Sequence, residues 1–117
     1  QTKGAMDYFP ECVKKKSIVL PNFIQIDDKQ FAPMEEKNKE IAFSARFEVK
    51  QKRQDIMVKS MKIVAEKHPD WKLVFYGDGD DQGLIEQMVE DFKLSENVVF
   101  AGKIKDVNEY IYKSRMF

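Results

Sequence analysis

The sequence predicts an α/β fold, a Rossmann-like parallel sheet with flanking helices. Short apolar runs alternate with segments of helical periodicity in the order β-α-β-α-β-α. This order implies parallel strands joined by right-handed crossovers. The run Leu73–Tyr76 is continuously apolar, as is typical of a strand that is covered on both faces.

The expected strands are the apolar runs that end at turn residues. The first run is closed by Pro21 and Asn22, and a later one by Gly102. The expected strands are Ser17–Leu20, Ile41–Ala45, Leu73–Tyr76, Asn97–Ala101 (a buried-type strand) and the start of one more at Arg115–Phe117.

Three amphipathic segments predict the helices. Met57, Met61 and Val64 recur at i, i+4 and i+7, which predicts a helix from about residue 54 to Lys67, before Pro69. Apolar residues between positions 84 and 92 predict a second helix.

A third helix is expected near the end of the chain. Asp106 with Glu109 three residues later resembles a capping box, and Val107, Tyr110 and Ile111 would form its apolar face.

The remaining segments are less regular. Residues 27–39 are polar and are expected to form a connecting loop. Residues 1–16 predict a short helix broken at Pro10. Four apolar side chains there are expected to face a core: Met6, Tyr8, Phe9 and Val13.

The amino-acid composition limits the classes of ligand that the chain is expected to bind. Lysine plus arginine and aspartate plus glutamate both total 20, so the chain has no net charge. This balance argues against nucleic-acid binding by a basic face, but it permits local binding of a small anion. With one histidine and the single Cys12 far apart, neither a metal site nor a cofactor is expected. The lone cysteine also favours a reducing compartment such as the cytoplasm.

The 117 residues correspond to one domain or to part of one. The chain begins with Gln1 rather than Met, and the apolar residues Met116 and Phe117 would have no strand to pair with. Since a doubly wound domain normally continues for further βα units, we expect a fragment of a longer protein.

Two cations mark the expected binding site. Arg46 follows the run 41–45, and Lys52 opens the next amphipathic stretch. In open α/β sheets, ligands bind beyond the carboxyl ends of the strands, where helix N-termini also attract anions. Arg46 and Lys52 therefore predict a phosphate subsite, and the turn Gly77-Asp78-Gly79 follows the next strand.

Four stretches of the chain form an ordered set of motifs: Leu20–Ile24, Ser44–Phe47 with Lys52–Asp55, His68–Leu73 with Tyr76–Gly79, and Asn97–Gly102 with Asp106–Val107. Each motif is weak alone, but together, in their order and spacing, they resemble a known family. This family is the retaining nucleotide-sugar glycosyltransferases of the two-Rossmann-domain (GT-B) architecture, or glycosyl transferases group 1. At two positions where the family usually has glycine, this chain has Ala45 and Arg53.

The resemblance implies the first half of a C-terminal, donor-binding domain across residues 1–117. Arg46 and Lys52 would bind the diphosphate of a UDP- or GDP-sugar. Gly77 and Gly79 would let the chain turn beneath the nucleotide. The backbone of Lys103 and Ile104 would contact the base of the nucleotide.

The family's catalytic histidine, its glutamate pair and the domain that binds a glycan or lipid-linked acceptor would all lie outside the chain. No catalytic residue is therefore expected here, and the chain alone should be inactive. The implied setting is polysaccharide or glycoconjugate assembly.

Other functions remain open from the residues themselves. The alternatives are a stand-alone flavodoxin-like nucleotide-binding or signalling module, an interaction domain with an open sheet edge, and a sugar-nucleotide epimerase. Asp78 and Asp80 are poor phosphoacceptors because they sit in a glycine turn. The run Lys14–Lys16 is expected to be a solvated face, with contact to an anionic membrane as the less favoured reading.

Overall fold

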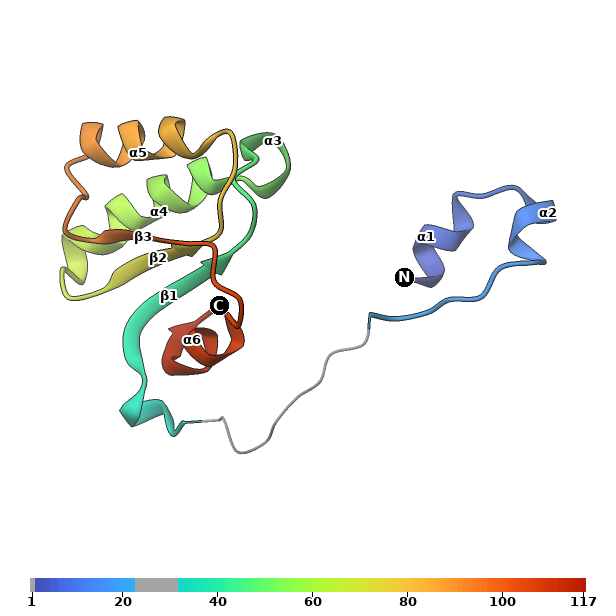
Figure 1. The fold of residues 1–117 in the computed structure, drawn as a ribbon, viewed down its shortest axis with the longest axis horizontal. Coiled ribbons are helices and arrows are strands. Elements are labelled where there is room, and N and C mark those ends of the chain that lie inside the picture. Colours follow the sequence, from blue (N-terminus) through green and yellow to red (C-terminus); the bar gives the residue numbers. More distant parts are fainter. Residues whose placement is uncertain (1, 23–31) are drawn as a thin grey trace.

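A computed structural model describes residues 2–22 and 32–117. Its centre is a four-stranded sheet with the strand order β3-β2-β1-β4, in which every pair is parallel (Figure 1). The strands are β1 (Asn38–Ser44), β2 (Lys72–Tyr76), β3 (Val98–Gly102) and β4 (Ser114–Met116). The predicted α/β class is confirmed.

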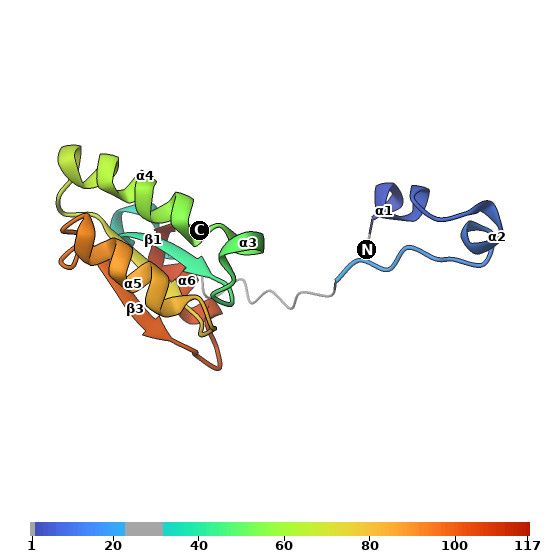
Figure 2. The same cartoon turned by 90° about the horizontal axis from the view of Figure 1, so that it is seen from above.

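Helices cover the two faces of the sheet unequally. The long helices α4 (Gln54–Lys67) and α5 (Gln82–Asp91) lie side by side on one face. The short helix α6 (Asn108–Lys113) lies on the other (Figures 1 and 2). None of the described helices has both the length and the apolar character needed to cross a bilayer.

Strand β2 shows how alternation along a strand builds both faces. Leu73 and Phe75 belong to a large apolar cluster with residues of α4 and α5. Val74 and Tyr76 point the other way and form a small cluster with Ala42, against which residues of α6 and its approach pack. Side chains alternate between faces with a period of two, so one strand supplies both cores.

The predicted Met57, Met61 and Val64 stripe is confirmed. Met61 is buried in the large cluster, and Met57 and Val64 pack against it. A four-residue helix that was not predicted, α3 (Val49–Lys52), precedes α4. Lys52 therefore ends α3 and does not open the long helix.

The expected strand Ser17–Leu20 is wrong. Residues 17–22 have no regular structure, and Ile18 and Leu20 are exposed. An apolar run becomes a strand only where another strand pairs with it, and residues 17–20 belong to none of the strand pairs of the described sheet. The rest of the turn expected at 20–24 lies outside the described residues.

The N-terminal residues form two short helices, α1 (Lys3–Asp7) and α2 (Glu11–Lys14), separated at Pro10 as expected. Neither helix has a buried residue. Tyr8, Phe9 and Val13 are exposed, so their expected core role is wrong.

The polar segment 27–39 ends in regular structure. Residues 27–31 lie outside the described part, and the 3-10 helix η2 (Met34–Glu36) follows Pro33. Strand β1 then begins at Asn38, three residues before the predicted start.

The C-terminal expectations need two corrections. The capping box is not formed, because α6 begins after Val107 without a side-chain hydrogen bond at its N-cap. The last strand is not unpaired, because β4 lies parallel to β1 and Met116 is opposite Ile41.

Strand β3 is only partly buried. It is an edge strand of the described sheet, and Val99 is 44% exposed. The predicted buried-type strand therefore has the right position but the wrong burial.

Candidate functional site

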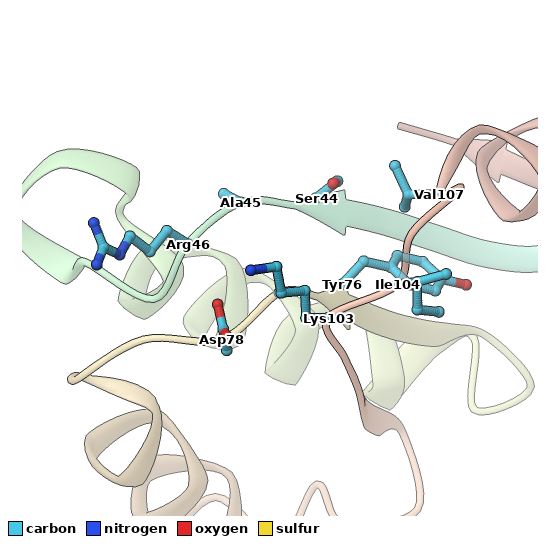
Figure 3. A pocket seen from close by; sticks show the side chains of 9 residues that line it. Ser44, Ala45, Arg46, Tyr76, Asp78, Lys103, Ile104 and Val107 are labelled. Atoms are coloured by element: carbon cyan, nitrogen blue, oxygen red, sulfur yellow. The ribbon is translucent and has the colours of Figure 1, made fainter.

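A cavity of about 440 Å³ opens beyond the carboxyl ends of β1, β2 and β3 (Figure 3). This is the edge of an open parallel sheet where ligands bind. The cavity is lined by Ser44, Ala45, Arg46, Tyr76, Gly77, Asp78, Lys103, Ile104 and Val107.

Four of the six predicted site residues line this cavity: Arg46, Gly77, Lys103 and Ile104. The guanidinium of Arg46 lies at one end, and the Lys103 ammonium points into the space between Ala45 and Asp78 (Figure 3). The structure thus brings together two cations and one carboxylate at the mouth of the sheet.

The other two predicted residues are not among those that line the cavity. Lys52 is exposed at the end of α3, six positions beyond Arg46. Gly79 lies further along the turn that contains Asp78. Their proposed part in nucleotide binding stays a prediction.

A second hollow of about 380 Å³ adjoins the first and shares Arg46 with it. Its other walls are formed by Phe47 and by charged residues of both signs: Glu48, Lys50, Asp80 and Asp81. Arg46 therefore stands between two open spaces, where its guanidinium is accessible to solutes from either side.

The two glycines of the turn are required by the protein itself. A Cβ on Gly77 would lie 2.1 Å from the Ala45 carbonyl oxygen, and one on Gly79 would lie 2.5 Å from that of Phe47. Both glycines also have positive φ angles, +151° and +154°. The resemblance implies that these glycines let the chain turn beneath a nucleotide, and the structure adds that the backbone after β1 already excludes a side chain at both positions.

Backbone hydrogen bonds continue the parallel pairing past the ends of the strands. The Ala45 amide donates to the Tyr76 carbonyl at 3.1 Å, and the Phe47 amide donates to that of Asp78 at 2.9 Å. The Gly77 amide donates to the Gly102 carbonyl at 2.9 Å. Hydrogen bonds thus join the loops that follow β1, β2 and β3 under the cavity, and they keep Arg46 close to the glycine turn.

Sequence reasoning missed Gln54 as a site residue. Its side chain is fully buried, and its Nε2 donates to the Arg46 carbonyl oxygen at 2.8 Å. Within residues 2–22 and 32–117, its Oε1 is a buried polar atom with no hydrogen-bond partner. Such an atom costs about 1–3 kcal/mol. A glutamine in the first turn of an otherwise amphipathic helix was the available signal.

Asp81 was also missed. Its Oδ2 accepts a hydrogen bond from the Val49 backbone amide at 2.8 Å, so it satisfies a free amide at the start of α3. This bond ties the helix that ends at Lys52 to the turn after β2.

Arg53 is one of the two residues that stand where the family usually has glycine. It has a left-handed backbone, with φ 55° and ψ 40°, between α3 and α4. Glycine adopts this conformation without cost, which accounts for a glycine being usual there. The Arg53 side chain hydrogen-bonds Asp55, and this contact holds the pKa of the Asp55 carboxyl below its usual value.

In the part of the chain that the structure describes, the site cations have no such partner: Arg46, Lys52 and Lys103 belong to none of the ion pairs. Their charges are therefore available to an anionic ligand, in contrast to that of Arg53.

A polar cluster underlies one wall of the cavity. The Tyr76 hydroxyl donates to Glu40 Oε1 at 3.0 Å, and the Ser114 hydroxyl reaches the same oxygen at 2.7 Å. Burial raises the pKa of the Tyr76 hydroxyl, and the hydrogen bond to Glu40 and its charge raise it further. This hydroxyl therefore stays protonated and serves as a donor that orders the wall.

No three metal-ligating side chains lie close together within residues 2–22 and 32–117. The cavity's charged groups are those of Arg46, Lys103 and Asp78.

The fold and the position of this cavity define a class, the α/β domains of GT-B glycosyltransferases. TarM has a TM-score of 0.67 at 26% identity over 80% of this chain and 18% of its own. A Staphylococcus aureus TarM mutant with fondaparinux, alpha-GlcNAc-glycerol and UDP has a TM-score of 0.63 at 20% identity, over 88% of this chain and 22% of its own. The C-terminal domain of LpcC, a group 1 family protein from Francisella tularensis, has a TM-score of 0.53 at 24% identity, over 79% of this chain and 50% of its own.

The chain belongs to the glycosyl transferases group 1 family, whose family model matches residues 25–117. It is 29% identical over 127 aligned positions to an uncharacterized glycosyltransferase of Methanocaldococcus jannaschii. That alignment covers 100% of the chain but 31% of the relative. An uncharacterized glycosyltransferase of Haemophilus influenzae is 25% identical over 63 residues, which are 54% of the chain and 18% of that protein.

Proposed function

We propose that this chain is the first half of the donor-binding domain of a retaining glycosyltransferase, and that it binds the diphosphate of a UDP- or GDP-sugar. One observation carries the proposal: in a group 1 family chain, Arg46, which has no ion-pair partner among the described residues, lines a cavity beyond the carboxyl ends of three parallel strands. The UDP in the TarM complex supports a nucleotide of this kind as ligand.

The charges suit the chemistry. When the sugar is transferred, the nucleoside diphosphate leaves with increasing negative charge, and fixed cations stabilise it. Arg46 offers a planar fork that can bind two phosphate oxygens, whereas Lys52 supplies a point charge. Gly77 lines the cavity and, with Gly79, lets the chain turn beneath the nucleotide, while Lys103 and Ile104 line the cavity where the base would lie.

The remaining parts of the reaction require other parts of a longer protein. The chain spans 31% of the length of its Methanocaldococcus relative, which leaves room there for an acceptor domain and catalytic groups. We propose hexosyl transfer in polysaccharide or glycoconjugate assembly. Cys12 supports a cytoplasmic setting, and peripheral contact of Lys14–Lys16 with the inner face of a membrane is the less favoured alternative to a solvated face.

Nucleotide titration tests the donor site. Each charged hydrogen bond contributes roughly 1.5–3 kcal/mol, so two cations give an affinity near 1 mM, or about −4 kcal/mol. Adding UDP, GDP or ADP to the isotopically labelled chain should shift NMR signals of residues 45–54, 76–79 and 103–107. The ranking of the three nucleotides would identify the base.

Matched variants sharpen this test. Arg46→Gln should weaken UDP binding about tenfold, the equivalent of one charged hydrogen bond, and Lys52→Gln should weaken it less. Lys67→Gln, which removes an exposed charge at the opposite end of α4, should have no effect. Unchanged affinity in Arg46→Gln, or shifts confined to other regions, would refute the site.

A further inference from the structure

The peptide unit between Arg46 and Phe47 is held at both of its polar groups. Its carbonyl oxygen accepts the hydrogen bond from Gln54 Nε2, at 2.8 Å. Its amide donates to the Asp78 carbonyl oxygen, at 2.9 Å. The orientation of this peptide constrains the direction in which the Arg46 side chain leaves the backbone. Two elements, α4 and the glycine turn, therefore restrict that direction together.

Packing alone does not account for a glutamine at position 54. The side chain is fully buried in the first turn of α4, where Val58 and Met61, on the same face, are apolar. Its Oε1 has no partner among the described residues, so the amide is only half satisfied. An apolar side chain of similar length would fill this space without leaving an acceptor unpaired. The amide donor is the property that an apolar residue cannot supply.

We propose that Gln54 is a positioning residue, which holds the Arg46–Phe47 peptide so that the guanidinium stays at the mouth of the cavity. This inference rests on the proposed function for its effect on nucleotide affinity, but the bond to the carbonyl exists without a ligand. A cation fixed beforehand binds an anion better than a mobile one, because less ordering is needed on binding.

Gln54→Met is the direct test, since methionine has a similar length and lacks the donor. UDP affinity should fall about threefold to fivefold. In the free protein, the NMR order parameters of the Arg46 and Phe47 amides should fall from about 0.85 toward 0.6. The carbonyl carbon signal of Arg46 should shift as its hydrogen bond is lost.

Val58→Ala is the matched control. It removes buried atoms from the same face of α4, one turn further along, and should lower the melting temperature. UDP affinity and the Arg46 signals should stay unchanged. If Val58→Ala reproduces the affinity loss and the fall in order parameters, Gln54 acts only through stability and the inference is wrong.

A double variant separates this inference from the donor site. If Gln54 acts through Arg46, adding Gln54→Met to Arg46→Gln should cause no further loss of UDP affinity. If Arg46→Gln itself has no effect on UDP binding, the proposed function fails. The order parameters then decide the role of Gln54 on their own: a fall confined to residues 45–48 supports it, and unchanged values overturn it.

Discussion

The two faces of the sheet differ in what they bury. The face under α4 and α5 holds a large apolar cluster. There the centroid of the Phe75 ring lies 5.4–5.6 Å from the ring centroids of three other phenylalanines: Phe43, Phe47 and Phe100. The face under α6 has a small apolar cluster of three buried residues, Ala42, Val74 and Tyr76, and it adjoins the cavity. The same strands supply both.

The difference separates stability from function. Aromatic rings and aliphatic side chains fill the larger face, so burial there supplies most of the stabilising free energy. The smaller face combines a small apolar cluster with the hydrogen-bonded groups of Tyr76, Glu40 and Ser114, and its cavity remains open to solvent. The two roles can be tested separately because they lie on alternate residues of β2.

The largest effect is expected from Phe75→Ala. Phe75 is 1% exposed, and removing its ring should lower the free energy of unfolding by about 3–5 kcal/mol. Val74→Ala, the adjacent change on the other face, should cost about 1.5 kcal/mol, from two groups at roughly 0.8 kcal/mol each. Urea unfolding measures both. Equal losses would contradict the inequality of the two faces.

Gly79→Ala tests how far the larger core extends. Its Cβ would meet the backbone of Phe47, a member of the large cluster, so we expect a loss of about 1–3 kcal/mol. Gly83→Ala is the control. This glycine lies in α5 with nothing within 4 Å of the added Cβ, and alanine should stabilise the helix by about 0.5–1 kcal/mol. If Gly79→Ala raised the free energy of unfolding as Gly83→Ala does, the turn would not be held by Phe47.

The smallest effect is expected on the cavity face, from Tyr76→Phe. Losing the hydrogen bond to Glu40 should cost about 0.5–1.5 kcal/mol at neutral pH. The pKa of Tyr76 is raised in the folded protein above its usual 10.0. Above pH 10 the unfolded chain therefore loses this proton first, and stability falls as the pH rises.

Thermal unfolding of the original chain and Tyr76→Phe between pH 8 and pH 11 measures this dependence. The stability advantage of Tyr76 should be constant below pH 10 and should shrink above it. A constant difference over the whole range would show that the hydroxyl is not protected by the fold.

The parallel sheet was predictable because its signals are local. Short apolar runs identified β1, β2 and β3, helical patterns identified α4 and α5, and a short apolar end identified β4. The run at 17–20 had the same local signal but has no partner strand in the described sheet, so it remains irregular. Burial of Val99 was overestimated for a related reason, since an edge position does not follow from composition.

The candidate site was predictable only in part. The order of the motifs identified Arg46, Gly77, Lys103 and Ile104, all of which line the cavity. The relation between Gln54 and Arg46 was not visible, because it depends on a helix folding back onto a loop eight positions earlier.

Local patterning was enough to specify the alternation of strands and helices, their parallel arrangement and the edge at which the cations gather, since periodicity and turn chemistry are properties of neighbouring residues. Folding in three dimensions decided which atoms the glycines avoid, which side chain holds the Arg46 carbonyl and which runs find a strand to pair with. These are contacts between distant positions, and their geometry is set by packing.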